Sequence, residues 1–423
     1  MKKDTQLAHL GRVAVNEPKT VSVPLHRAST VLFDSLAEMD ATQAAWNADE
    51  QVTTYGVFNM PQEVALANAV AEIEGGYRAA TFPSGLAAVA VALLACVKSG
   101  DHVLMTDSGY APGRLFAANF LSRFNPSGSK SPPLAAQSRL QICGFELGVD
   151  TSRLAARLFI VTIEFYDPLI GAGIEALMKP NTSAVYTESP GSHTFEVQDI
   201  PAISKVAHAH SALVIMDNAW ATGYFFNAFA HGVDLVVQPA TKYYAAHADV
   251  VIGLVIASKE TWPLLKNAAL NLGQRASPDD CFLALRGMRT LGVRMKQHEA
   301  SALVVAQWLE TRPEVQRVIY PALPGDPGYA LWKRDFTGAS GLFSIELKPC
   351  SKPQLAAMLD HYAHFGLGYS WGGFESLVAP AHIGNARTVH PWQGGPLVRY
   401  HIGLEDTDDL ISDLEAGFAR LAA

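Results

Sequence analysis

From Pro61 onward, short apolar stretches of strand length alternate with segments of helical spacing, and this alternation constrains the fold more than any other feature. In the first predicted helix, Gln62–Glu74, the apolar residues fall on one face, and Gly75-Gly76 ends it. Strands that alternate with helices indicate a mainly parallel sheet covered on both faces, with ligands at the carboxyl ends of the strands. The predicted strands are Ala79–Phe82, His102–Met105, Thr162–Tyr166, Ser183–Glu188, Ala212–Asp217, Asp234–Gln238 and Val250–Ala257.

The 423 residues allow two or three domains. Residues 1–60 look irregular, and we expect an N-terminal arm that packs on another element or a neighbouring subunit. Residues 61–288 form the predicted large domain, and 289–423 a smaller C-terminal α/β domain that a long helix over Cys281–Arg294 introduces. A polar, turn-rich stretch opens a segment of about 125–160 that we interpret as an insertion. Further elements are expected at Gly341–Lys348 (strand), Lys352–Phe365 (helix), Leu397–Leu404 (strand) and Asp408–Leu421 (helix).

Composition excludes several classes of protein. Acidic residues outnumber basic ones by 40 to 32 without any basic cluster, which argues against nucleic acid or an anionic membrane as partner. The longest apolar run, Leu86–Val97, is much shorter than the roughly 20 residues of a membrane span, and Met1–Arg12 has no signal-peptide core. The four cysteines match neither a disulfide framework nor zinc-ligand spacing. We expect a cytoplasmic protein with no metal site.

Three residues that follow or end predicted strands could take part in chemistry, and each also has a purely structural interpretation. Gly85 opens a helix whose first N–H groups suit a phosphate, although an ordinary turn has the same form. Asp217 ends a buried strand, where it either caps the next helix or pairs with a cationic ring nitrogen or a metal. Lys242 lies between two apolar stretches. Burial would lower its pKa and suit it to a Schiff base, whereas the alternative is a lysine that extends to the surface.

In combination, these residues fit pyridoxal 5'-phosphate (PLP). The helix start would bind the phosphate, Asp217 would keep the ring nitrogen protonated, and Lys242 would hold the aldehyde. Thr241 offers a hydroxyl to the phosphate, and Tyr110 is placed to stack on the ring. No G-x-G-x-x-G motif follows a strand, which argues against a dinucleotide-binding dehydrogenase.

At these residues the sequence resembles the Cys/Met-metabolism PLP enzymes, and among them the bacterial cystathionine β-lyases. The resemblance extends from about Leu7 to Leu421 and implies fold type I, with a mainly parallel seven-stranded sheet in the large domain. The shared stretches include Glu72-Ile-Glu-Gly-Gly76, Gly100-Asp-His-Val-Leu-Met105, Tyr166-Asp-Pro-Leu-Ile-Gly171, Glu188-Ser-Pro-Gly-Ser192, Ala240-Thr-Lys-Tyr243, Thr290-Leu-Gly-Val-Arg294, Tyr369-Ser-Trp-Gly-Gly-Phe-Glu-Ser376 and His401-Ile-Gly-Leu-Glu-Asp406.

The resemblance implies a role for each site residue. Lys242 matches the Schiff-base lysine, Asp217 the partner of the pyridinium nitrogen, and Tyr110 the ring-stacking tyrosine. Gly85 and Leu86 match the phosphate-binding amides. The remaining matches are Tyr55, a tyrosine that reaches the neighbouring subunit's site; Arg399, the clamp of the substrate α-carboxylate; and Ser370 and Trp371, active-site positions of the β-lyase.

The implied reaction is β-elimination of L-cystathionine to homocysteine, pyruvate and ammonia, in a homotetramer built as a dimer of dimers. Trp371 favours this reaction, because related γ-lyases and γ-synthases usually carry Leu there. Val57 stands where a phosphate-binding Arg is usual, and the segment of 125–160 is longer than in the family. The alternatives are another sulfur amino acid lyase, such as a cysteine desulfhydrase or methionine γ-lyase, and a PLP-binding regulatory protein with weak turnover.

Overall fold

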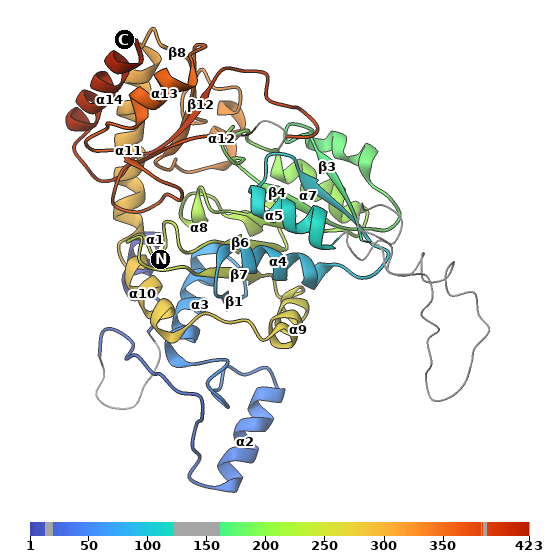
Figure 1. Cartoon of the computed structure of the whole chain (residues 1–423). Helices are drawn as coiled ribbons and strands as arrows, with labels where there is room; N and C mark the ends of the chain where they lie inside the picture. Colours follow the sequence, from blue (N-terminus) through green and yellow to red (C-terminus); the bar gives the residue numbers. More distant parts are fainter. Residues whose placement is uncertain (13–19, 122–160, 382, 384–386, 423) are drawn as a thin grey trace, which may run out of the picture.

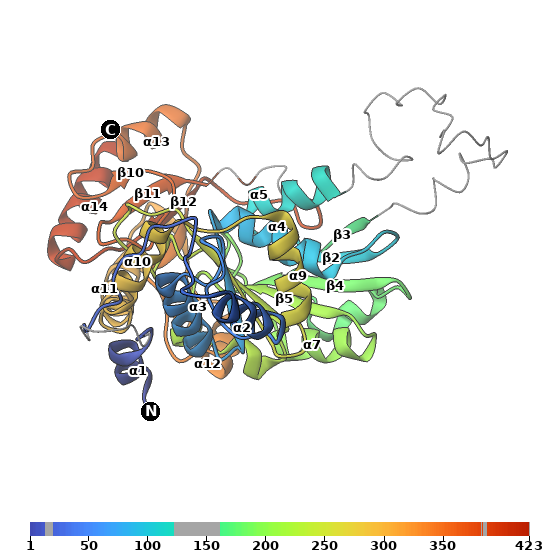
Figure 2. The ribbon, with the colours of Figure 1, turned by 90° about the horizontal axis from the view of Figure 1, so that it is seen from below.

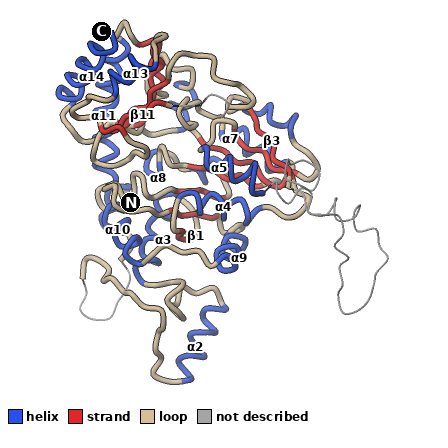
Figure 3. The backbone as a smooth tube through the Cα atoms, in the orientation of Figure 1, coloured by secondary structure: helices blue, strands red, loops and turns tan. Residues whose placement is uncertain are grey.

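The computed structural model describes residues 1–12, 20–121, 161–381, 383 and 387–422. Two sheets organise these residues, a large one in the first two thirds of the chain and a smaller one near the C-terminus (Figures 1 and 3). The large sheet has seven strands in the order β1-β7-β6-β5-β4-β2-β3. Its strands are β1 (Arg78–Phe82), β2 (His102–Thr106), β3 (Thr162–Tyr166), β4 (Thr182–Glu188), β5 (Leu213–Asp217), β6 (Leu235–Gln238) and β7 (Gly253–Ala257).

Strands β6, β5, β4, β2 and β3 pair in parallel, whereas β7 pairs antiparallel with both β1 and β6. The prediction of a mainly parallel seven-stranded sheet is therefore confirmed. In the pairing of β4 with β5, Glu188 lies opposite Asp217 at the carboxyl ends of the two strands. This register places two acidic residues side by side at the edge where ligands collect in such sheets.

Helices cover both faces of the large sheet. On one face, α4 and α9 pack against side chains such as Ile215 and Val237, and on the other face α3 and α7 pack against their neighbours Val214 and Val236. Because successive side chains in a strand point to opposite faces, Asp217 shares the α4 face with Ile215. The helices of this part are α3 (Pro61–Glu74), α4 (Gly85–Cys96), α5 (Ala111–Leu115), η1 (Phe116–Leu121), η3 (Gly171–Leu177), α7 (Ile200–Ala209), α8 (Thr222–Phe225), η4 (Ala228–His231), α9 (Trp262–Leu272) and α10 (Pro278–Met288).

The smaller sheet has five strands in the order β10-β11-β12-β9-β8 and is mostly antiparallel. Figure 2 shows it with α13 and α14 at one end of the molecule. Its elements are α11 (Leu291–Glu310), β8 (Val315–Ile319), α12 (Tyr329–Asp335), β9 (Leu342–Leu347), α13 (Lys352–Leu359), β10 (Gly366–Leu367), β11 (Leu377–Pro380), β12 (Leu397–His401) and α14 (Thr407–Ala422).

Two helix predictions in this region are wrong. The single helix expected over Cys281–Arg294 is divided between α10 and α11, because the buried Arg294 donates from Nη2 to the Gly287 carbonyl (2.8 Å) and from Nε to Thr290 Oγ1 (3.0 Å). The helix expected to reach Phe365 ends at Leu359. The carboxylate of Asp413 instead takes the backbone N–H groups that follow at residues 363 and 364.

The N-terminal region is less irregular than predicted. It forms two helices, α1 (Lys3–His9) and α2 (Leu36–Asn47). Ser35 caps α2 by accepting from the Glu38 N–H (3.1 Å), and Glu38 accepts in turn from the Asp34 N–H (2.7 Å). This Ser-x-x-Glu spacing is a helix-start signal that the sequence interpretation overlooked. Helix α2 buries none of its side chains and stands apart from the body below α3 (Figure 1).

The proposed insertion at 125–160 lies outside the described residues. None of the helices among the described residues combines the length and apolar character that a membrane crossing requires.

Candidate active site

The first component of the site is the N-terminus of α4. Ser84 Oγ accepts from the Ala87 N–H (3.1 Å), whereas the N–H groups of Gly85 and Leu86 have no acceptor among the described residues. Gly85 is needed here because a Cβ at this position would lie 2.7 Å from the Cβ of Pro239. The two open N–H groups and the positive end of the helix dipole suit a phosphate.

The second component is the pair of carboxyl groups at the ends of β4 and β5. Asp217 is 5% exposed; its Oδ1 accepts from the Ala219 N–H (3.0 Å), and its other oxygen has no donor among the described residues. Burial raises the pKa of Asp217 to about 7, against the opposing charge of Lys242. Burial and the charge of Asp217 raise the pKa of Glu188 to about 8. A cationic group placed beside Asp217 would relieve this cost.

Glu188 also fixes the loop that carries Tyr110. Its Oε2 accepts from the Tyr110 backbone N–H (2.6 Å), and its Oε1 accepts from the Ser192 hydroxyl (2.6 Å). The Tyr110 ring stays 41% exposed, and burial together with the charges of Asp217 and Glu188 raises the pKa of its hydroxyl. Its partly exposed ring is therefore held near the two carboxyl groups by the bond between its backbone and Glu188.

The third component joins Lys242 to the C-terminal sheet. Lys242 Nζ donates to Ser370 Oγ (2.6 Å) and lies 5.3 Å from the centre of the Trp371 ring. Arg399, on β12, donates from Nη2 to the backbone oxygen of the same Ser370 (3.0 Å). Burial and the nearby charge of Arg399 lower the pKa of Lys242 to about 8. The amine is still mostly protonated at pH 7, but a far larger fraction of it is neutral than in an ordinary lysine, which favours nucleophilic and general-base roles.

A tight turn brings these groups together. Ser370 has φ 72°, a conformation that costs a non-glycine residue about 1–3 kcal/mol. Two residues later Gly372 has φ 87°, and a Cβ there would lie 2.9 Å from the Tyr243 nitrogen. The turn therefore packs directly on the backbone that carries Lys242.

The structure places the other predicted residues differently. The hydroxyl of Thr241 donates to the Ile252 carbonyl (3.1 Å) and accepts from the Ile252 N–H (2.9 Å), so its proton is already engaged beside the site. Tyr55, in the N-terminal arm, has a side chain that is about half exposed, and no described contact joins it to Lys242 or Asp217. Its predicted role in a neighbouring subunit stays a prediction.

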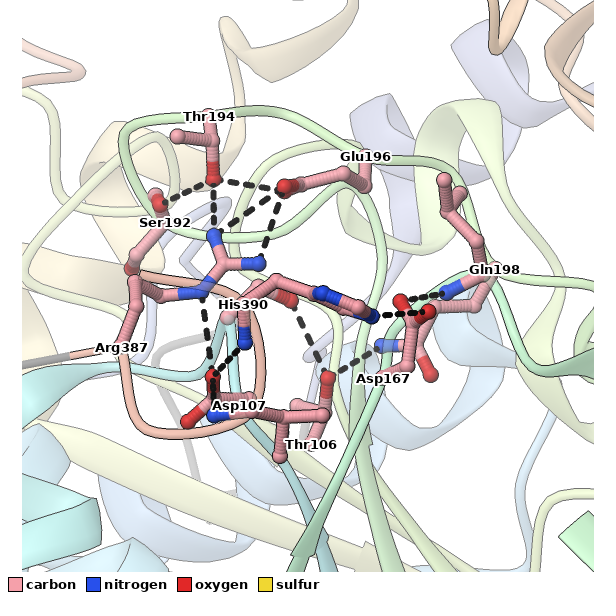
Figure 4. Close-up of polar contacts among 12 residues, drawn as sticks. Thr106, Asp107, Asp167, Ser192, Thr194, Glu196, Gln198, Arg387 and His390 are labelled. Carbon is pink, nitrogen blue, oxygen red and sulfur yellow. Dashed lines mark hydrogen bonds and ion pairs between the residues drawn. The ribbon is translucent and has the colours of Figure 1, made fainter. Parts of the chain in front are cut away.

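A strap, residues 387–396, runs from the carboxyl edge of the large sheet to β12 of the smaller sheet. Figure 4 shows Arg387 and His390 of this strap beside Asp107. The fully buried Asp107 accepts from the backbone N–H groups of Thr388 (2.9 Å) and Val389 (2.8 Å) and from Arg114 Nη2 (2.6 Å). Arg387 in turn bonds Thr194 (2.7 Å) and Glu196 (3.1 Å). These contacts tie the strand that carries Arg399 to the loop that carries Tyr110.

Sequence reasoning missed Glu188, Asp107 and Glu74, a buried carboxylate that accepts from Gln238 (2.8 Å) and Tyr244 (2.6 Å). Glu188 carried the same signal as Asp217, since it is an acidic residue at the end of an apolar strand. Asp107 directly follows β2 and carried a weaker form of this signal. Glu74 is the last residue of α3 and had no signal beyond its place before the two glycines.

These residues fit PLP. The open N–H groups of α4 suit the phosphate, the unpaired buried oxygen of Asp217 suits a ring N–H, and the low-pKa amine of Lys242 suits the aldehyde. The fold and this donor set define a PLP-dependent enzyme of fold type I.

Comparisons with known proteins agree. A sequence profile described as Cys/Met metabolism PLP-dependent enzyme matches residues 4–135 and 150–419. Cystathionine beta-lyases of Escherichia coli (strain K12) and Salmonella typhimurium are 41% and 40% identical to the chain, over 99% of it and 99% and 98% of their own lengths. A crystal structure of cystathionine gamma-lyase from Lactobacillus plantarum, complexed with L-serine, has a TM-score of 0.83 and 26% identity and covers both chains fully. The chain belongs to the Cys/Met metabolism PLP-dependent enzyme family.

Proposed function

We propose that this chain is a carbon–sulfur lyase that converts L-cystathionine and water into homocysteine, pyruvate and ammonia by β-elimination. The observation that carries this proposal is the turn at Ser370, which binds Lys242 through its side chain and Arg399 through its backbone. A proton-transferring amine and a carboxylate-binding guanidinium are thus held at one place, as an amino acid substrate requires. The relatives named cystathionine beta-lyase over nearly the full chain support the choice of substrate.

Lys242, Asp217, Gly85, Leu86 and Tyr110 would hold PLP, with Thr241 beside its phosphate. When bound, PLP supplies an electron sink for the pair left at the substrate Cα. Asp217 would hold a proton on the ring nitrogen, because a carboxylate buried beside it stabilises the cation. Tyr110 would limit the movement of the ring with its aromatic face.

Arg399 would bind the substrate α-carboxylate through two parallel hydrogen bonds and so orient the Cα–H bond. Lys242 Nζ would remove the Cα proton and later deliver a proton to the departing sulfur. Through its hydrogen bond to Nζ, Ser370 Oγ would keep the Lys242 amine in one position during both proton transfers. Removal of the Cα proton needs a neutral amine, which the lowered pKa of Lys242 favours, and the proton gained in that step is the one delivered to the sulfur.

Trp371 supports β-elimination over γ-elimination. Its ring lies beside the Lys242 amine, at a position where the γ-acting relatives usually carry Leu. The test is the identity of the keto acid released from L-cystathionine by purified, PLP-supplemented protein. Pyruvate with homocysteine is expected, and kcat/KM should exceed the values for cysteine and methionine. Release of 2-oxobutyrate with cysteine, or bound PLP without turnover of any sulfur amino acid, would contradict the proposal.

We further propose a homotetramer, a dimer of dimers in which Tyr55 of each arm completes a neighbouring site. Large apolar side chains of the arm are exposed in the isolated chain, including Leu32 (89%) and Leu36 (73%). The test is to mix the inactive variants Tyr55→Ala and Lys242→Ala after reversible dissociation. Shared sites would restore part of the activity in mixed dimers, whereas independent sites would restore none.

A further inference from the structure

Glu74 is a buried carboxylate with an unusually complete set of hydrogen-bond donors. It ends α3 and is 0% exposed. Its Oε1 accepts from the Gly223 N–H (2.7 Å), Gln238 Nε2 (2.8 Å) and the Tyr244 hydroxyl (2.6 Å), and its Oε2 accepts from Asn218 Nδ2 (2.9 Å). A carboxylate is kept in such a place only when several donors replace its hydration.

The donors belong to the two segments that carry the central site residues. Asn218 directly follows Asp217, and Tyr244 comes two residues after Lys242. Gln238, which ends β6, also donates to the Asn218 carbonyl (2.7 Å) and so joins the same two segments a second time. Glu74 therefore connects the chain after β5 with the chain after β6.

Glu74 reaches these segments from behind the site. Asp217 points to the α4 face of the sheet, whereas the next side chain, Asn218, points to the α3 face and meets Glu74. Lys3 of α1 lies beyond Glu74 and donates to the Gly223 and Tyr224 carbonyls. Burial lowers the pKa of Lys3 against the opposing charge of Glu74, and burial raises the pKa of Asp217 to about 7 with a smaller contribution from Glu74. Burial also raises the pKa of Glu74 itself to about 7.

We propose that Glu74 is a positioning residue of the active site, whose buried carboxylate holds Asp217 and Lys242 at a fixed separation so that both address one PLP molecule. This inference rests on the roles proposed above for Lys242 and Asp217. Glu72, two residues earlier in α3, is exposed, and among the described residues its carboxylate bonds only Gln6 (3.2 Å), so the helix offers a matched control.

The test compares four variants of the full chain by visible circular dichroism of bound PLP, PLP affinity and melting temperature. Glu74→Gln keeps the size and shape of the side chain but replaces one accepting oxygen with an N–H₂ group, which cannot accept hydrogen bonds from the donors around Glu74. We expect it to reduce the visible dichroism and to weaken PLP binding about tenfold, the size of effect that outer hydrogen-bond partners have in metal sites. Glu72→Gln should match wild type. Val70→Ala, in the core of the same helix, should lower the melting temperature without changing the dichroism.

Tyr244→Phe removes one donor and keeps the Glu74 carboxylate. It should change the visible dichroism in the same direction as Glu74→Gln, by a smaller amount. If Glu74→Gln does not fold, Tyr244→Phe tests whether Glu74 positions the site. Wild-type dichroism and PLP affinity in the folded Glu74 or Tyr244 variant would overturn the inference. So would an equal change in Val70→Ala at equal loss of stability. A wild-type protein that binds no PLP would instead refute the proposed function, so the two failures are distinguishable.

Discussion

Lys242 and Ser370, 128 positions apart in the chain, are joined by a 2.6 Å hydrogen bond from Nζ to Oγ. The same serine accepts Arg399 through its backbone oxygen and has a left-handed backbone (φ 72°). A non-glycine residue is held in this conformation only where the surrounding structure compensates its cost. The strained turn thus sets where the amine of Lys242 lies relative to the carboxylate-binding arginine.

Replacing Ser370 by Ala removes the hydroxyl that orients Lys242 and leaves the turn intact. We expect kcat on L-cystathionine to fall about 10- to 100-fold, the cost of misplacing a catalytic group by about 1 Å, with little change in melting temperature. Steady-state kinetics checks this. Ser412→Ala serves as control, because the exposed Ser412 hydroxyl bonds only the Asp408 carbonyl of its own helix among the described residues. An unchanged kcat would show that the hydroxyl does not position the amine.

The rate at which apoenzyme takes up PLP should depend on the protonation of Lys242. Burial and Arg399 lower the pKa of this amine to about 8, and only the neutral amine attacks the aldehyde. The rate of regain of the PLP absorption band should therefore rise with pH, with a midpoint at about 8, and level off once the amine is fully neutral. Arg399→Gln removes a neighbouring positive charge, so the midpoint should move to higher pH. A pH profile identical to wild type in Arg399→Gln would contradict this coupling.

A methyl group at Gly85 should weaken PLP binding. The Cβ of Gly85→Ala would lie 2.7 Å from Pro239 Cβ and would displace the helix start that offers the Gly85 and Leu86 N–H groups. We expect a loss of PLP affinity on the order of tenfold, measured by equilibrium dialysis. Gly325→Ala, where a Cβ meets nothing within 4 Å, should bind PLP as wild type does. Equal affinities in the two variants would exclude the helix start as the phosphate site.

Asp107→Asn should destabilise the protein, because it removes the buried carboxylate that Arg114 and Arg387 share, although Arg387 keeps its ion pair with Glu196. Breaking such a buried pair costs about 3–5 kcal/mol, which urea unfolding at fixed protein concentration would detect. Asp167→Asn breaks an exposed contact of the same strap with His390 and should cost under about 1 kcal/mol. Similar losses in both variants would contradict the central place of Asp107 in anchoring the strap.

The same carboxylate predicts a pH dependence of stability. Burial alone would raise the pKa of Asp107, but the Thr388 and Val389 N–H groups, the Thr388 hydroxyl and Arg114 outweigh it and lower the pKa. Its contribution is therefore present above the unfolded-state pKa of about 4 and is lost as the pH falls through the lower folded value. Wild type should lose more stability than Asp107→Asn over this acidic range.

Much of the fold could be predicted because strands such as β5 and β6 are apolar runs that end at polar residues. The alternation of these strands with helices then predicted a mainly parallel sheet. The division at Arg289 and the early end of α13 could not be predicted, because distant polar groups cause them: Arg294 binds Gly287, and Asp413 binds the chain after α13. Propensity alone carries no information about such contacts.

The candidate site was predictable in part for a similar reason. Asp217 ends the apolar strand β5, and Lys242 lies in the turn after the apolar strand β6, so the sequence itself marks the carboxyl edge of the sheet. Glu74 and Asp107 gain their importance from donors contributed by segments far away in the chain, such as Tyr244 and Thr388. The bond between Lys242 and Ser370 likewise depends on how the two sheets pack.

The most direct test of the account is release of pyruvate and homocysteine from L-cystathionine by PLP-supplemented wild type beside Lys242→Ala, with the folded state of both checked by far-ultraviolet circular dichroism. The account predicts release by wild type and a loss of at least about 10³-fold in the folded variant, because one amine both holds the cofactor and moves the proton. Release by Lys242→Ala at the wild-type rate would contradict it.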